Sequence, residues 1–172
     1  MRRTIITAAA LLSLMLPALA QETATAAMKA PDGSDLGTVT FTATKSGILL
    51  VFVEMTGLKP GAHGFHIHAV GKCEGPEFES AGGHIAGGKP HGVMAEGGPH
   101  PGDFPNVHVG QDGLLKVEFF TDRLTLDESG DGALMDADGS AVMLHDGPDD
   151  YVTDPSGHSG GRIACGIIQQ PG

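Results

Sequence analysis

The amino-acid sequence predicts an all-β protein whose strands pair antiparallel in a sandwich or barrel. Several short segments alternate polar with apolar residues, which is the period of a strand half buried on one face. No segment after residue 20 carries a helical stripe of useful length. The 27 glycines and 11 prolines separate the segments with turn signals. Many short strands joined by turns are typical of antiparallel sandwiches and barrels.

The predicted strands lie on either side of a long segment without strand pattern. Lys45-Ser46-Gly47 indicates a hairpin turn between the first two strands, and Gln111-Asp112-Gly113 indicates a second hairpin between the third and fourth. The segment of residues 71–106, which lies between these hairpins, is too long for an ordinary connection between strands. Its length indicates a functional loop. The predicted strands are 38–44, 48–55, 107–109, 114–121, 141–144 and 162–168.

The N-terminus has the features of a secretory signal peptide. Two arginines precede an almost wholly apolar run from Ile5 to Leu16, and Ala18-Leu19-Ala20 supplies small residues before a cleavage site. The run is too short to cross a bilayer comfortably, so we expect no membrane association after cleavage. We therefore expect residues 1–20 to be removed and residues 21–172 to form one exported domain, most simply in a bacterial periplasm.

The charge balance excludes some classes of partner. The chain has 10 basic and 21 acidic side chains, for a formal net charge of -11. Nucleic acids and anionic membranes are bound through clusters of Lys and Arg, so we expect neither as a partner. An anionic substrate would require a local positive charge.

The two cysteines, Cys73 and Cys165, belong to a chain that is expected to enter an oxidising compartment. A disulfide is the default expectation there, with two free thiols as the alternative. A bridge would close a loop of about ninety residues, which contributes about 4–5 kcal/mol in the chain-entropy model.

Histidines are the most informative residues of the sequence. His66 and His68 lie two apart in an apolar strand, so their side chains point to the same face and can reach one metal ion. His84, His91, His100 and Asp103 follow in a glycine-rich loop that can bend sharply around an ion. Three imidazoles and a carboxylate form a four-coordinate set that suits zinc. Solvated surface histidines would explain any one of these residues but not the whole set.

Four motifs occur around the histidines and the second cysteine: Gly64-Phe65-His66-Ile67-His68, Ala81-Gly82-Gly83-His84, Gly98-Pro99-His100-Pro101-Gly102-Asp103 and Gly161-Arg162-Ile163-Ala164-Cys165-Gly166. In this order they resemble the motifs of the copper–zinc superoxide dismutases of the bacterial exported type, and the resemblance runs from about Gly37 to Ile168. The resemblance implies a Greek-key antiparallel β-sandwich or barrel with long metal-binding loops.

The resemblance also implies a role for each site residue. Arg162 would hold the anionic substrate beside the copper, and Asp149 would accept hydrogen bonds from one copper histidine and one zinc histidine. Cys73 and Cys165 would form the family's intramolecular disulfide. Copper would be bound by His66, His68, His84 and His145, and zinc by His84, His91, His100 and Asp103.

The implied activity is dismutation of superoxide to oxygen and hydrogen peroxide, which would protect the exported compartment. Copper would change oxidation state while zinc stays structural, and His84 would bridge the two ions. On reduction of the copper, the bridge is expected to break on the copper side, so that the freed His84 nitrogen carries a proton.

Other activities make different demands on the sequence. An exported copper or zinc carrier without turnover would lack Arg162 or an open copper position. A zinc hydrolase would need a His-Glu-x-x-His helix, and the sequence has none. Residues 146–161 contain four acidic residues and no Lys or Arg, which predicts weaker steering of superoxide or steering by other residues. The sequence leaves a homodimer open.

Overall fold

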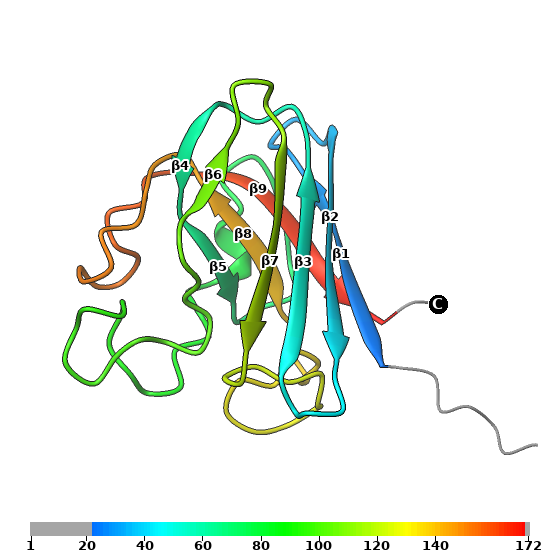
Figure 1. Ribbon diagram of the computed structural model, residues 1–172, viewed down its shortest axis with the longest axis vertical. Helices are drawn as coiled ribbons and strands as arrows, with labels where there is room; N and C mark the ends of the chain where they lie inside the picture. Colours follow the sequence, from blue (N-terminus) through cyan, green and yellow to red (C-terminus); the bar gives the residue numbers. More distant parts are fainter. Residues whose placement is uncertain (1–21, 171–172) are drawn as a thin grey trace, which may run out of the picture.

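The computed structural model describes residues 22–170; the predicted signal peptide, residues 1–20, lies outside them. All strand pairs between the named strands are antiparallel, and the prediction of an all-β fold is confirmed. One curled sheet has the order β5-β8-β9-β1-β2-β3-β7, and β4 pairs with β6 (Figure 1). The strands are β1 (Thr23–Lys29), β2 (Asp35–Ala43), β3 (Leu49–Met55), β4 (Gly61–His63), β5 (Phe65–His68), β6 (Val107–Val109), β7 (Leu115–Thr121), β8 (Ala141–His145) and β9 (Arg162–Gln169).

The strand order combines neighbours in sequence with a strand from the far end of the chain. Strands β1, β2 and β3 follow one another along the sheet, and the last strand, β9, returns to lie beside β1. No helix in residues 22–170 is long and apolar enough to span a membrane.

Alternation of side chains builds the core on the concave face of the sheet. In β2 and β3 the register pairs Val39 with Val53 and Phe41 with Val51, and all four side chains are fully buried. Cross-strand pairs of β-branched and aromatic side chains are the main stabilising unit of a sheet. The three rings of Phe65, Phe104 and Phe119 pack together with centroid separations of 5.3 to 5.9 Å.

Two features of the sheet differ from the sequence prediction. The turn at residues 110–114 is present, but β6 pairs with β4 and β7 pairs with β3, so the predicted second hairpin is wrong. A turn signal is local and does not determine which strands pair beyond it. Strand β1 was not predicted, because its buried residues, Ala24, Ala26 and Met28, give only a weak strand pattern.

Two long loops lie together on one side of the sheet, where they meet β5 and β8. Figure 1 shows the green loop after β5 and the orange loop between β8 and β9 on the same side. Between His68 and Val107 the only named element is a 3-10 helix, η1 (Glu79–Ala81), and no named strand lies there, as predicted for residues 71–106. The expected disulfide is confirmed: Cys73, in the first loop, is bonded to Cys165 in β9. The bond fixes the first loop to the sheet.

Candidate metal centre

Four histidines from three parts of the chain converge at the junction of the sheet and the first loop. His66 and His68 project from β5, His145 ends the neighbouring strand β8, and His84 comes from the loop. A register shift in the β8–β9 pairing falls between Leu144 and His145, and such an irregularity can re-aim the side chain beside it. One ring nitrogen from each of the four lies within 4.8 Å of the others.

The nitrogens that face this point have no hydrogen-bond partner. In residues 22–170, the buried side-chain nitrogen and oxygen atoms without a partner are His66 Nδ1, His68 Nε2, His84 Nε2 and His145 Nε2. A buried polar atom without a partner costs about 1–3 kcal/mol, so four at one point require an explanation. A bound metal ion supplies it, because each nitrogen can donate its lone pair to the ion.

The opposite ring nitrogens of three of these histidines have fixed acceptors. His66 Nε2 donates to Asp149 Oδ2 at 2.7 Å, His68 Nδ1 donates to the Gly82 carbonyl at 2.8 Å, and His145 Nδ1 faces the Gly160 carbonyl at 3.2 Å. We call the unpartnered nitrogen, which faces the other three histidines, the inner nitrogen, and the opposite one the outer nitrogen. Each acceptor holds the proton on the outer nitrogen and leaves the inner nitrogen free to bind metal.

Burial keeps three of these imidazoles, those of His68, His84 and His145, neutral near pH 7. Burial, with a smaller contribution from the neighbouring imidazoles, lowers the pKa of His68 to about 2. Burial likewise lowers the pKa of His84 to about 4 and the pKa of His145 to about 3. A metal ion therefore meets deprotonated ligands at neutral pH, and its binding does not have to displace these protons.

A second group surrounds the carboxylate of Asp103. The Nδ1 atoms of His84, His91 and His100 lie 2.8, 3.1 and 3.2 Å from Asp103 Oδ1. Asp103 Oδ2 accepts the amides of Gly92 and His100, at 2.9 and 3.0 Å, which fixes the carboxylate plane. Burial alone would raise the pKa of Asp103, but the hydrogen bonds from His84 and from the Gly92 amide hold it below its usual value. Three nitrogens and one anionic oxygen within 4.8 Å suit a closed zinc site.

His84 belongs to both groups and joins them. Its Nδ1 faces Asp103, while its Nε2 is one of the four unpartnered nitrogens. The ring of His84 stacks near the ring of His66 with centroids 4.1 Å apart. One imidazole can therefore contact an ion on each side.

Asp149 links the two groups a second time. Its Oδ2 accepts from His66 Nε2 at 2.7 Å, and its Oδ1 accepts from His91 Nε2 at 3.0 Å. Burial would raise the pKa of Asp149, but these two imidazoles and the Tyr151 amide hold it below its usual value. Gly157 (φ +64°) packs against the carboxylate, where any side chain would overlap Asp149 Oδ1.

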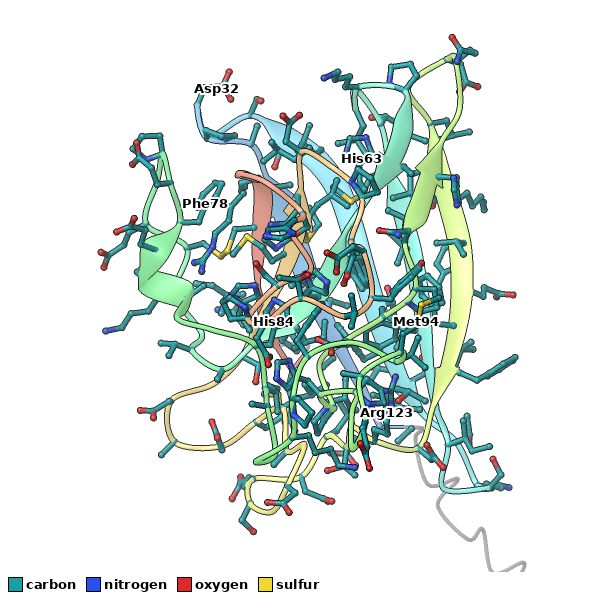
Figure 2. The ribbon with its side chains drawn as sticks, turned by 90° about the vertical axis from the view of Figure 1, so that its left-hand side faces the viewer. Asp32, His63, Phe78, His84, Met94 and Arg123 are labelled. Atoms are coloured by element: carbon teal, nitrogen blue, oxygen red, sulfur yellow. A yellow bond between two sulfur atoms is a disulfide. The ribbon has the colours of Figure 1, made fainter. Side chains whose placement is uncertain are left out.

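Arg162 lies at the start of β9, opposite His145 in the strand register. Its Nη1 donates to the Phe78 carbonyl at 2.6 Å and its Nη2 donates to the Gly82 carbonyl at 2.7 Å. Phe78 has a left-handed backbone (φ 55°) and is buried beside the disulfide (Figure 2). Burial lowers the pKa of Arg162 and Glu79 raises it, yet a guanidinium stays charged at neutral pH.

An open hollow of about 390 Å³ adjoins Arg162. Arg162 is the only basic side chain among those that line it. Glu77 and Glu79 also line the hollow, together with Pro76, Gly160 and Gly161. A small anion that enters there meets a single, fixed positive charge.

The remaining histidines lie outside both groups. His63 is buried, and its ring nitrogens lie 2.7 Å from the His145 carbonyl and 2.8 Å from the Lys59 carbonyl. His108 and His158 are exposed, and His158 faces Asp150 at 3.2 Å.

Three residues that support the site were missed from the sequence. Asn106 Nδ2 donates to the Asp149 carbonyl, and Asn106 Oδ1 accepts from the Asp149 amide. The Phe78 carbonyl accepts a hydrogen bond from Arg162. Arg123 donates hydrogen bonds to the carbonyls of His100 and Asp103. A left-handed backbone or a carbonyl acceptor leaves no mark on the side-chain sequence, so no signal pointed to them.

Comparison with known proteins agrees with this geometry. Residues 36–168 match the copper/zinc superoxide dismutase (SODC) family. The chain belongs to this family. It is 42% identical over 149 residues to the Cu-Zn superoxide dismutase of Caulobacter vibrioides, covering 85% of each chain, and 37% identical to that of Deinococcus radiodurans, covering 88% of this chain and 86% of the relative.

Solved structures of family members superpose on the chain. A SOD-like protein from Bacillus subtilis matches with a TM-score of 0.80 and 36% identity, covering 83% of this chain and 96% of the other. The Cu/Zn superoxide dismutase from Brucella abortus matches with a TM-score of 0.67 and 31% identity, covering 86% of this chain and all of the other. The two histidine groups thus lie in a copper/zinc superoxide dismutase fold.

Proposed function

We propose that this chain dismutes superoxide, with copper held by the four unpartnered nitrogens and zinc held by the group around Asp103. The observation that carries the proposal is the set of unpartnered inner nitrogens, three of whose histidines have outer nitrogens with fixed acceptors. Copper would be bound by His66, His68, His84 and His145, and zinc by His84, His91, His100 and Asp103.

The reaction transfers one electron between two superoxide anions. One superoxide loses an electron and leaves as oxygen; the other gains that electron and two protons and leaves as hydrogen peroxide. Bound copper supplies two accessible oxidation states for this exchange, and zinc supplies none. Because the substrate is small, the site requires a narrow approach and a positive charge rather than an elaborate pocket.

Arg162 and His84 are the residues to which we assign direct roles in the reaction. Arg162 would bind the anion at the edge of the hollow, and its two carbonyl partners hold the guanidinium in one orientation. His84 Nε2 would hold a proton for the departing product, while His84 Nδ1 remains directed at Asp103. Asp149 would orient His66 and His91 through its two oxygens.

We further propose that residues 1–20 direct export to a bacterial periplasm and that residues 21–172 form the mature enzyme. The disulfide between Cys73 and Cys165 fits that oxidising compartment. Superoxide produced there would be the substrate.

Metal content and activity of the purified mature protein test the proposal. We expect one copper and one zinc per chain together with superoxide dismutation, and loss of both copper and activity in His145→Ala. Two bound metals without dismutation would favour a metal carrier instead. Arg162, fixed beside the hollow, favours the enzyme over the carrier.

A further inference from the structure

Arg123 makes contacts that the proposed reaction does not use. It lies two residues beyond β7, on the segment that leads to β8, and is far in sequence from every proposed metal ligand (Figure 2). Its Nη2 donates to the Asp103 carbonyl at 2.9 Å, and its Nη1 donates to the His100 carbonyl at 3.3 Å. In the part of the chain that the structure describes, Arg123 forms no salt bridge.

The two carbonyls belong to the first and last residues of a single turn. His100-Pro101-Gly102-Asp103 is closed by a hydrogen bond from the Asp103 amide to the His100 carbonyl at 3.2 Å. Both end residues direct their side chains into the group proposed to bind zinc, with His100 Nδ1 3.2 Å from Asp103 Oδ1. The guanidinium therefore spans the turn that sets the distance between two proposed zinc ligands.

The backbone that carries Arg123 is itself fixed. Its amide donates to Thr121 Oγ1 at 3.2 Å, and the next residue, Leu124, is buried in the main core. Gly132 (φ +82°) packs so closely on the Arg123 carbonyl that any side chain there would overlap it. The guanidinium is thus attached to the sheet and not to the loop that it holds.

We propose that Arg123 is a positioning residue for the zinc site: its planar fork holds the His100–Asp103 turn in the conformation that aims both side chains at one ion. This inference rests on the zinc site proposed above. Arginine suits the task because its donors are arranged in a rigid fork, whereas lysine presents three rotatable donors on one compact ammonium group and lacks the fixed spacing of the fork. Residues that orient metal ligands in this way typically contribute about 10- to 100-fold to metal affinity.

The test is the zinc affinity of the disulfide-intact, copper-free protein, measured by competition with a chromophoric chelator. We expect Arg123→Met to weaken zinc binding about 10- to 100-fold, and Arg123→Lys to weaken it by a smaller factor. Lys89→Met is the matched control. Lys89 is exposed and lies on the loop that carries the His100–Asp103 turn, so its replacement removes a positive charge without changing the turn itself. Its zinc affinity should stay within about twofold of the unmodified protein.

Two further readouts separate positioning from general stabilisation. Copper affinity of the zinc-free protein should be unchanged in every variant, because the Arg123 guanidinium donates to the His100 and Asp103 carbonyls and to none of the four proposed copper ligands. Cobalt bound in place of zinc should give a visible spectrum altered in Arg123→Met and unaltered in Lys89→Met, since the spectrum reports coordination geometry.

Specific outcomes would overturn the inference. Zinc affinity of Arg123→Met equal to that of the unmodified protein, with only a lower melting temperature of the metal-free form, would leave Arg123 a structural residue. Equal losses of zinc and copper affinity would do the same. If Arg123→Met does not fold, an unchanged zinc affinity in Arg123→Lys rejects the inference. Failure of the unmodified protein to bind zinc would instead reject the proposed zinc site itself.

Discussion

Replacing Asp149 by asparagine would remove one acceptor from a carboxylate that serves both histidine groups. Its Oδ2 accepts from His66 Nε2, and its Oδ1 accepts from His91 Nε2 and from the Tyr151 amide at 2.6 Å. An asparagine side chain has one oxygen and one NH₂ group. In either amide orientation, the NH₂ group therefore faces an imidazole N–H, and one proposed metal ligand loses its acceptor.

The expected cost follows from the bond that is lost. A hydrogen bond to a charged group contributes about 1.5–3 kcal/mol, which corresponds to about 10- to 100-fold in affinity. The same factor is typical when the partner of a metal-binding histidine is removed.

The assay is competition with chelators, with zinc and copper affinities measured separately for each variant. Asp150→Asn is the control, because the Asp150 carboxylate accepts from the amides of its own turn and an asparagine oxygen can still do so. We expect Asp149→Asn to lower the affinity for at least one of the two metals, the one whose histidine faces the NH₂ group, and Asp150→Asn to leave both affinities unchanged. Zinc and copper affinities of Asp149→Asn within about twofold of the unmodified protein would refute the reasoning.

Three further predictions follow from the disulfide, the buried histidines and the hollow. Cys73→Ser should lower the free energy of unfolding by about 4–5 kcal/mol, because the bridge spans 92 residues; an unchanged denaturation midpoint would contradict this. In the metal-free protein the depressed pKa values of His68, His84 and His145 leave these groups neutral when folded, whereas unfolded imidazoles titrate near pH 6.5. Stability should therefore fall as the pH drops below about 6.5, by at most about 2 kcal/mol per histidine at pH 5, and equal urea midpoints at pH 7 and pH 5 would count against this account. Glu79→Gln removes a negative charge from the hollow beside Arg162 and should raise kcat/KM severalfold at low ionic strength; the gain should vanish in high salt, and a gain that persists there would rule out an electrostatic cause.

Much of the fold and of the candidate site could be predicted because the signals were local or periodic. The alternation in residues 38–44 and 48–55 matches β2 and β3 to within a few residues. The i, i+2 spacing placed His66 and His68 on one face of a strand, and their ring nitrogens do lie in one group. Such patterns depend on which side chains of a segment are buried and which are exposed. They can therefore be recognised without knowing which other segments pack against it.

The features that escaped prediction depend on partners distant in sequence. The turn at residues 110–114 carries the same signal whether or not its flanking strands pair with each other. On an unbroken strand His63, three residues before His66, would face away from it, but the strand breaks at Gly64 and the His63 side chain turns into the protein to meet the His145 carbonyl. The contacts of Arg123 and Arg162 go to backbone carbonyls, which every residue has and which side-chain chemistry therefore cannot single out.

Anomalous diffraction from crystals loaded with copper and zinc tests the central claim most directly, because data at the two absorption edges identify each metal by position. We predict a copper peak among the inner nitrogens of His66, His68, His84 and His145, and a zinc peak beside Asp103 Oδ1, at the Nδ1 edge of the His84 ring. A single metal shared by both positions, or zinc at the first position with nothing beside Asp103, would contradict the two-metal site proposed here.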